Sequence, residues 1–252
     1  MPGAEPLQDN PLGISRGPLP VHNLGPEPKQ PASFRILRQE VVDLNLLAFY
    51  PHRHEFYEII LVLEGQGTHV VDFTPLPLDP PELHFVSPGQ VHFWDLETRP
   101  HMLAILFTED FLIPDPGQRS FLYTLSLFNT WEGPQSMVLE KDACEQVQAL
   151  CSTMEEECAH SRFARETLLR SLLTSLLIRA QRFADPSDTP SLSGEDPVCD
   201  QETTSLARRF VRLAARRFDT ERSVAAYAKA LNITPGHLAD VVRKATGQTP
   251  GR

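Results

Sequence analysis

The chain has 252 residues, a length that suits two domains of ordinary size. Its composition is 41% hydrophobic and 22% charged, which is typical of a globular protein with a buried core. No stretch approaches the run of about 18 apolar residues that a membrane-spanning helix needs, and the N-terminal residues lack the basic patch and apolar run of a secretory signal. We therefore expect a cytoplasmic protein that does not enter the membrane.

The net charge of −10 is unevenly distributed along the chain. Residues 201–252 contain ten Lys or Arg and four Asp or Glu, a surplus of six positive charges, whereas the first 200 residues carry a net charge of −16. An acidic body with a basic tail is expected when only the tail contacts phosphates. This asymmetry predicts double-stranded DNA as a partner of the C-terminal part.

The first half of the chain changes from a Pro- and Gly-rich arm to a series of short strands. Residues 1–33 have no apolar period, and we expect them to be disordered. Residues 34–130 contain short runs rich in β-branched and aromatic residues, separated by Gly, Pro and Asp. The clearest runs are 41–50, 56–64, 68–73, 83–87 and 101–108. Short strands at this spacing predict a sandwich or barrel.

Residues 131–184 change to a helical period. Between 141 and 159, apolar residues recur at steps of three and four, and residues 162–183 have a wide leucine face. These faces look too wide for one barrel to cover, so we expect an antiparallel pair that makes a homodimer through residues 141–183. Cys144, Cys151 and Cys158 lie two helical turns apart, about 10.5 Å, and cannot share a metal ion. We expect them to pack as small hydrophobic residues, with redox sensing as the alternative.

A histidine-rich motif lies in the strand region. His52, His54 and Glu58 are separated by even offsets, so on a strand they point to the same side, where His92 from a later strand could join them. Three imidazoles and a carboxylate can bind Fe, Mn, Ni or Zn. The spacing, continued by Gly65 and by a Pro-Gly segment that ends on His92, resembles the motifs of the cupin superfamily. That resemblance implies a β-barrel and, in an enzyme, these four residues as metal ligands.

Two features favour a ligand pocket over a metal centre. His52 and His54 directly follow Pro51, which favours a loop at the barrel mouth. The second motif has adjacent Pro and Gly and lacks the Asn that the cupin pattern carries after the last His. We therefore expect His52, His54, Glu58 and His92 to bind a small-molecule effector, with no metal, no cofactor and no catalytic residue. The alternative is a metal-dependent cupin enzyme, such as a dioxygenase or isomerase.

Beyond a polar linker at 185–200, residues 201–252 predict three helices at 202–218, 223–231 and 234–246. Ser223 and Thr234 are suited to cap the last two, Pro235 suits a first helical position, and Asn232 suits the left-handed turn between them. The second of this pair would enter the major groove of DNA. Its expected DNA-contacting residues are Gly236, His237, Asp240, Arg243 and Lys244.

These helices resemble the first helix-turn-helix of the AraC/XylS family of regulators, in a pattern that runs from Leu206 to Pro250. The stretch from His52 to His92 also resembles the sensor domains of that family. The resemblance implies an α+β protein with a cupin-like β-barrel, a helical dimerisation segment and an α-helical DNA-binding domain. It further implies a transcription regulator that senses an effector in the barrel and reads DNA with helix 234–246, with RNA polymerase as a further partner.

Members of that family carry two helix-turn-helix motifs. This sequence ends at Arg252, where the helix that connects them is expected, so we expect the DNA-binding domain at 201–252 to be incomplete. The sequence is then either a fragment of a longer protein or a regulator with half of the usual DNA-binding domain. The effector, the operator and the choice between activation and repression are not predicted.

Overall fold

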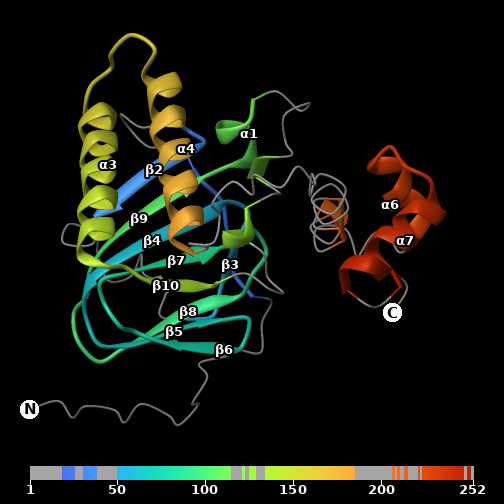
Figure 1. The fold of residues 1–252 in the computed structure, drawn as a ribbon, viewed down its shortest axis with the longest axis horizontal. Helices are drawn as coiled ribbons and strands as arrows, with labels where there is room; N and C mark the ends of the chain where they lie inside the picture. Colours follow the sequence, from blue (N-terminus) through green and yellow to red (C-terminus); the bar gives the residue numbers. More distant parts are fainter. Residues whose placement is uncertain are drawn as a thin grey trace, which may run out of the picture.

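The computed structural model has a β-rich N-terminal part, two long helices and a C-terminal helical part, which confirms the predicted α+β class (Figure 1). The structure describes residues 19–25, 31–38, 50–114, 121–122, 125–128, 134–184, 206–207, 209–210, 213–214, 221, 223–246 and 249–250. The linker at 185–200, nearly all of the strand expected at 41–50 and most of the helix expected at 202–218 lie outside these residues. Among the helices so described, none combines the length and apolar character that crossing a membrane requires.

The strands form two main antiparallel sheets. The larger has the order β10–β7–β4–β9–β2 and the smaller the order β6–β5–β8. The larger sheet consists of β2 (Phe34–Arg38), β4 (Tyr57–Glu64), β7 (Glu82–Val86), β9 (His101–Phe107) and β10 (Ser136–Val138). The smaller consists of β5 (Gly67–Val71), β6 (Thr74–Pro77) and β8 (His92–Leu96). Two short strands, β1 (Val21–His22) and β3 (Arg53–His54), pair in parallel.

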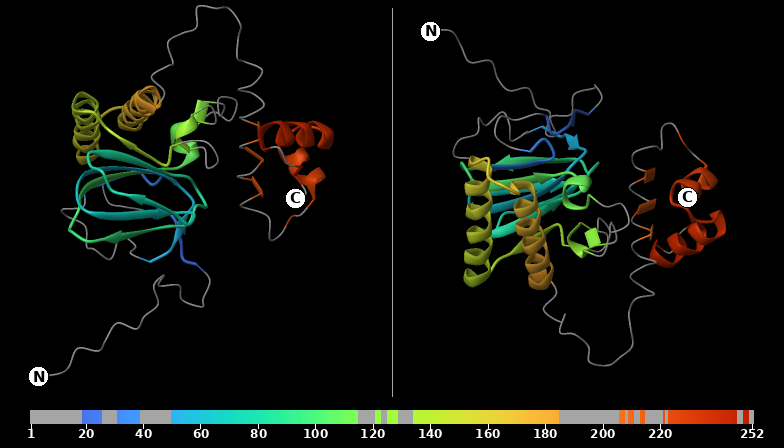
Figure 2. Two further views of the ribbon diagram at one scale, coloured as in Figure 1. Left: turned by 60° about the horizontal axis from the view of Figure 1, so that its bottom comes forward. Right: turned by 90° about the horizontal axis from the view of Figure 1, so that it is seen from above.

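The two sheets face each other but are not closed into a continuous ring in the part of the chain that the structure describes (Figure 2). The ladder of β4 shifts register between Val62 and Glu64, and the chain then turns through Gly65 and Gly67 into the smaller sheet. Both glycines have a positive φ, which other residues rarely adopt. The expected barrel is therefore an open, two-layered one.

Alternation along β4 explains which side chains reach the interior. Ile59 and Leu61 belong to the core beneath the helices, whereas Ile60 and Val62 pack between the two sheets. Because both faces of β4 are buried, its sequence is an almost continuous run of apolar residues. Glu58 has the same parity as Ile60 and therefore faces the interior.

Two long helices, α3 (Lys141–Ala159) and α4 (Arg165–Ala184), cover the outer face of the larger sheet (Figure 1). The three cysteines of α3 are buried in this core, as predicted. Leu173 and Leu176 are fully buried in the same core, and Leu172 packs against it. The chain's own sheet thus covers the inner part of this leucine face, whereas Leu168 of the same face is 44% exposed. The dimer stays a prediction.

The C-terminal part contains α6 (Val224–Ala230) and α7 (Pro235–Thr246), joined by a tight turn. Their inward residues form a separate small core with described residues of the preceding segment: Leu206, Ala207, Phe210, Tyr227, Ala228, Leu231, Leu238, Val241 and Val242. Two further short elements are α1 (Glu109–Leu112) and the 3₁₀ turn η3 (Ser126–Phe128).

Candidate functional site

Backbone pairing places the predicted histidines side by side. The N–H of His52 donates to the carbonyl of His92 at 3.1 Å, and the N–H of His92 donates to the carbonyl of His52 at 2.9 Å. The N–H of Gly89 donates to the carbonyl of His54 at 2.9 Å, which holds the Pro-Gly turn against β3. His52 and His54 are 7% and 2% exposed, so the expectation of an open loop at the barrel mouth is wrong.

The turn that leads into β8 is held by Asp72, at the end of β5. Its Oδ1 accepts the N–H of Val91 at 3.0 Å, and its Oδ2 accepts the side-chain amide of Gln90 at 2.9 Å. The Oε1 of Gln90 accepts the N–H of Ser87 at 2.7 Å. These bonds fix the turn and therefore the direction in which His92 enters the interior.

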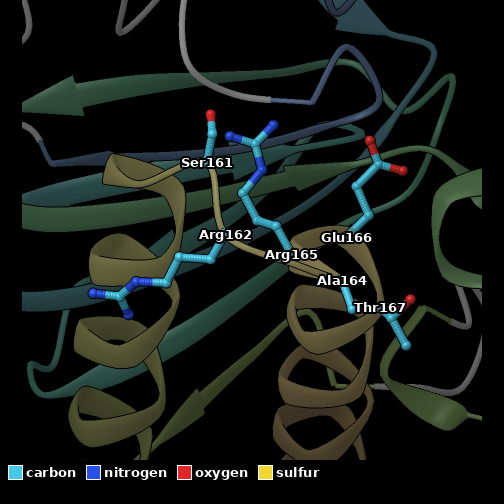
Figure 3. Close-up of a pocket in the computed structure, with 6 residues that line it drawn as sticks. All are labelled: Ser161, Arg162, Ala164, Arg165, Glu166 and Thr167. Atoms are coloured by element: carbon cyan, nitrogen blue, oxygen red, sulfur yellow. The ribbon is translucent and has the colours of Figure 1, made fainter.

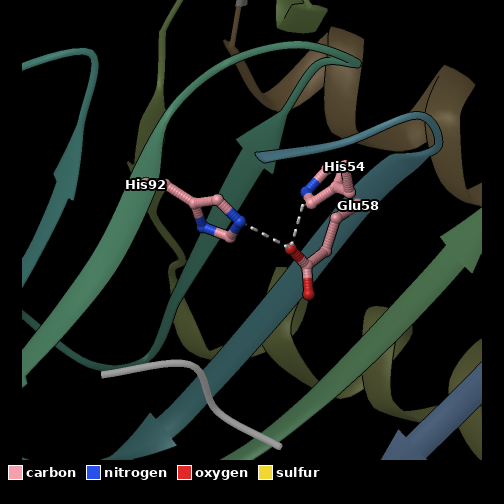
Figure 4. Close-up of side chains that lie close together, drawn as sticks. All are labelled: His54, Glu58 and His92. Atoms are coloured by element: carbon pink, nitrogen blue, oxygen red, sulfur yellow. Dashed lines mark ion pairs between the residues drawn. The ribbon is translucent and has the colours of Figure 1, made fainter. Parts of the chain in front are cut away.

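Three of the four predicted side chains converge at one point (Figure 4). Nε2 of His54 lies 3.3 Å from Oε2 of Glu58, and Nε2 of His92 lies 3.7 Å from the same oxygen. His52 lies beside them, with its ring centroid 4.2 Å from that of His92. The side chain of Glu58 is 16% exposed, so solvent reaches this cluster.

Hydrogen bonds to backbone carbonyls orient two of the rings. Nδ1 of His54 donates to the carbonyl of Phe56 at 2.7 Å, and Nδ1 of His52 donates to the carbonyl of Tyr50 at 3.1 Å. Burial lowers the pKa of His92 well below 6.5, and the neighbouring imidazoles lower it further. Burial also lowers the pKa of His52, although the carbonyl of Tyr50 opposes this. At neutral pH the site therefore presents a neutral imidazole at His92, next to the side chain of Glu58.

The converging atoms also suit a metal ion. One ligand atom from each of His54, Glu58 and His92 lies within 4.8 Å of the others. Ligand atoms around a tetrahedral zinc ion, each about 2.0–2.2 Å from the metal, lie about 3.3–3.6 Å apart. The three residues could hold a divalent ion and leave a position open for another ligand. We expected a metal-free site partly because His52 and His54 were expected on an exposed loop, and the structure does not support that reason. The absence of a metal stays a prediction.

The sequence analysis missed two further histidines in the interior. Nδ1 of His84 lies 3.1 Å from Nδ1 of His69, and Nε2 of His69 lies 3.0 Å from Nδ1 of His92. Nε2 of His84 lies 3.2 Å from Oε1 of Glu82, and the ring of His69 stacks on Trp94 at 3.9 Å. All five side chains are buried. The sequence contained a signal for them, because His69 and His84 lie at interior-facing positions of strands whose side chains alternate between the two faces.

A segment of the expected disordered arm lies against the site. β1 pairs with β3, the ring of His22 lies 5.1 Å from that of His52, and the hydroxyl of Tyr50 lies 3.2 Å from Nε2 of His22. The arm expected at 1–33 is therefore ordered at residues 19–25, because two backbone pairs and a ring contact fix it.

A surface depression lies elsewhere, at the turn between α3 and α4 (Figure 3). Its lining residues are Ser161, Arg162, Ala164, Arg165, Glu166 and Thr167. Arg162 pairs with Glu156 and Glu157 at 3.5 and 3.7 Å, and it points away from Arg165 in Figure 3. The depression thus gathers no converging ligand groups.

The local structure of the helix pair agrees with the sequence prediction. The hydroxyl of Ser223 accepts the N–H of Ala226, and that of Thr234 accepts the N–H of His237 at 3.2 Å. Asn232 has a φ of 58°, the left-handed conformation expected of the turn. The five predicted DNA-contacting residues are all exposed: Gly236, His237, Asp240, Arg243 and Lys244. Asp240 and Arg243 form an exposed ion pair at 2.7 Å.

Comparison with known families identifies the N-terminal part. The model of the AraC-like ligand binding domain matches residues 42–173, just over half of the chain. The chain belongs to this family. The match spans β3 to β9, α3 and the first half of α4, and therefore includes all four predicted effector-site residues.

Two similar proteins are HTH-type transcriptional activators named RhaR. The one from Enterobacter sp. (strain 638) is 23% identical over 159 residues, which are 63% of this chain and 55% of that protein. The one from Klebsiella pneumoniae is 24% identical over 168 residues, 65% of this chain and 57% of that protein. The chain thus spans slightly more than half the length of these relatives.

Two solved structures also align with the chain. Apo ToxT from Vibrio cholerae is 11% identical, with a TM-score of 0.37, over 88% of this chain and 96% of ToxT. The AraC-like transcriptional activator CuxR is 12% identical, with a TM-score of 0.35, over 87% of this chain and 70% of CuxR.

Proposed function

We propose that the protein is an AraC-type transcription regulator that senses a small effector between its two sheets and reads DNA with α7. The observation that supports this most is the presence, in one chain, of an AraC-like ligand-binding unit and a capped helix pair with an exposed basic helix. Binding of DNA also agrees with the positive charge of residues 201–252. A regulator of this kind acts in the compartment that holds the DNA, which we expect to be the cytoplasm.

The effector site consists of His52, His54, Glu58 and His92. His52 and His54 lie at β3, Glu58 on β4 and His92 on β8, and the bridge between His52 and His92 joins the β3 segment to β8. A ligand that contacts both the β3 segment and β8 favours the arrangement in which they are paired. Ligand binding would then raise the population of the conformation with paired strands, and the DNA-binding part would respond to that change in population.

The DNA-binding surface is the exposed face of α7. Gly236 and His237 lie in the first turn, where side chains of a recognition helix reach base edges. Arg243 and Lys244 lie in the last turn, where they can contact phosphates or a base. A good bidentate contact with a base contributes roughly 1–3 kcal/mol of discrimination. A few residues on one helix therefore decide which sequence is bound.

Selection from a random library of duplex DNA tests the DNA-binding role. The 252-residue chain should enrich a recurring sequence. Arg243→Ala should weaken binding, and His237→Ala should alter the enriched sequence if His237 contacts a base. Glu166→Ala, an exposed change on α4, is the matched control and should leave the selection unchanged. Selection without enrichment by the wild-type chain would refute the proposal.

A ligand screen by thermal unfolding tests the sensing role. An effector at a concentration one hundred times its Kd stabilises the protein by about 2.7 kcal/mol, which raises the melting temperature. Glu58→Gln and His52→Ala should lower or abolish this shift, whereas the exposed change His160→Ala should not. A ligand that stabilises wild type and both site variants equally binds elsewhere and contradicts the assignment.

The homodimer expected through residues 141–183 is part of this proposal. Leu176 is fully buried within the monomer, so replacing it would test folding and not assembly. Phe163 and Leu168, by contrast, are exposed large hydrophobic residues in this segment. The double variant Phe163→Glu with Leu168→Glu should become monomeric in light scattering while it stays folded. A wild-type chain that is monomeric at high micromolar concentration refutes the dimer.

The cluster of His54, Glu58 and His92 favours a second candidate, a metal-dependent enzyme of the cupin type. The relatives found are regulators, and the basic helix pair has no use in such an enzyme. Metal analysis of protein purified without chelator separates the two. We expect less than one equivalent of Fe, Mn, Ni or Zn together with DNA binding; a full equivalent with turnover of a substrate and no DNA binding would favour the enzyme.

A further inference from the structure

An ion pair lies on the exposed face of α7, among the residues expected to contact DNA. Nη2 of Arg243 donates to Oδ1 of Asp240 at 2.7 Å, and the two side chains are 62% and 61% exposed. Because the residues are three apart, they lie on the same face, one helical turn from each other. An exposed pair of this kind adds little to the stability of a fold. Its main effect is therefore on what α7 presents to DNA.

The pair brings the guanidinium toward the part of α7 that reaches base edges. Arg243 lies in the last turn, whereas the base-contacting residues of a recognition helix lie toward its N-terminus. Helical side chains lean toward the N-terminus, and the hydrogen bond holds the guanidinium at Asp240, one turn back. One further turn back, a Cβ at Gly236 would meet open space. In the described part of the chain, the N-terminal side of the pair is thus open to a ligand.

The pair presents hydrogen-bond donors and an acceptor side by side. A guanidinium has five N–H donors, and a carboxylate has two oxygens that can only accept. The bond between Nη2 and Oδ1 uses one donor and one lone pair, so further donors of Arg243 and the second oxygen of Asp240 can face a ligand. The carboxylate also repels phosphates, to which an unpaired Arg would bind without regard to sequence. The pair is therefore better suited to a base edge than to the DNA backbone.

A G·C base pair matches this arrangement in the major groove. Guanine presents two acceptors, N7 and O6, and cytosine presents a donor at N4. An Arg side chain binds both guanine acceptors with two N–H groups, and an Asp side chain accepts from N4 of cytosine. In an A·T pair the N6 donor of adenine would face the guanidinium, and the O4 acceptor of thymine would face the carboxylate. Like groups would then oppose each other, so the ion pair favours G·C.

We propose that Asp240 and Arg243 together read one G·C base pair, with Arg243 on guanine and Asp240 on cytosine. Asp240 determines specificity in two ways. It directs the guanidinium to the base, and its carboxylate disfavours both A·T and phosphate contacts. This inference deepens the proposed function, because it names the base pair that α7 selects, and it rests on that function.

Titration of altered duplexes, based on the sequence that the wild-type chain selects, tests the two contacts separately. The decisive position is the base pair that Arg243→Ala no longer selects. There we expect G·C, which the wild-type chain should prefer over A·T by about 5- to 150-fold. At this position 7-deazaguanine removes the N7 acceptor, and N4-methylcytosine removes the major-groove donor. Each should weaken binding by the wild-type chain. The first should not weaken Arg243→Ala further, and the second should not weaken Asp240→Ala further.

The variant Asp240→Ala separates base reading from a structural role. It should bind a scrambled duplex at least as tightly as wild type, because it removes a negative charge near phosphates, while its preference for G·C over A·T falls. A pair that only stabilised α7 would instead lower the melting temperature and weaken all duplexes equally. Asp142→Ala makes the same charge change at an exposed site on α3, and it should keep the wild-type preference.

The outcomes separate this inference from the proposed function. The inference fails and the proposed function stands if the wild-type chain selects a sequence with A·T at the decisive position. The same holds if Arg243→Ala leaves every position selected, or if N4-methylcytosine weakens wild type and Asp240→Ala equally. Failure of the wild-type chain to select any sequence removes both. Since the wild-type chain must itself bind both altered duplexes more weakly, a variant that does not fold leaves a test.

Discussion

The buried histidines predict a stability that falls as the pH is lowered from 7.5 to 5.5. His69 and His92 are neutral in the folded protein because burial lowers their pKa well below 6.5, whereas in the unfolded chain they regain a pKa near 6.5. Below that pH the unfolded chain binds protons that the folded protein does not. The stability is therefore fully present above pH 6.5 and is lost as the pH falls below it.

The size of the effect follows from proton linkage. Between pH 7.5 and 5.5, a histidine that is charged only in the unfolded chain lowers the free energy of unfolding by about 1.4 kcal/mol. His69 and His92 together should lower it by about 2.7 kcal/mol, and the lowered pKa of His52 adds in the same direction. This is a large part of the roughly 5–15 kcal/mol that stabilises a typical domain.

Urea unfolding with chelator at several pH values, followed by circular dichroism, measures this loss. His69→Gln should remove about half of the pH dependence, because one of the two histidines whose pKa is lowered most no longer titrates. His160→Ala, a change at an exposed histidine, should retain all of it. A free energy of unfolding that stays constant or rises from pH 7.5 to 5.5 would refute the assignment of neutral, buried imidazoles.

Three further predictions concern the folded core. In chemical denaturation, Gly67→Ala should destabilise the protein by several kcal/mol more than Gly89→Ala. Both glycines have a positive φ, but a Cβ at Gly67 would lie 2.4 Å from the carbonyl oxygen of Asp95, whereas a Cβ at Gly89 would meet open space. Equal losses of stability in the two variants would contradict this. Leu176→Ala should cost about 2–5 kcal/mol, because the side chain is fully buried, and a loss below about 1 kcal/mol would show that α4 does not pack as described. Burial raises the pKa of the Cys151 thiol to about 12, so thiol reagents at pH 8 should leave it unmodified until the protein unfolds, and rapid labelling of the native chain would contradict this.

The parts of the molecule that depend on local chemistry could be predicted from the sequence. The helix pair is specified by residues that act on their own neighbours: Ser223 and Thr234 cap the two helices, and Asn232 adopts the left-handed turn. The even spacing of His54 and Glu58 predicted that they lie on one side, although the structure interrupts the strand between them at Glu55 and Phe56. Each of these depends on contacts within a few residues, which the sequence displays directly.

What depends on packing between distant segments was harder to predict. The wide apolar face of α4 did not reveal whether the chain's own sheet or a second subunit covers it, because both would select leucines such as Leu173. His69 and His84 were missed for a similar reason. Each is a single histidine in its own strand, and only the pairing of β5 with β8 and the packing of the two sheets bring their rings together. The depth of His52 followed from its pairing with β8, which overrides the loop preference that Pro51 suggested.

The central claim is that α7 lets this chain recognise a particular DNA sequence. Fluorescence anisotropy of the 252-residue chain on its selected duplex and on a scrambled duplex of equal length tests it, across a series of salt concentrations. We predict tighter binding to the selected duplex, by a factor that Arg243→Ala reduces. Lys244→Ala should instead weaken both complexes and lower the salt slope by about 0.9, as the loss of one phosphate contact does. Equal affinity of the wild-type chain for the two duplexes at every salt concentration would contradict the claim.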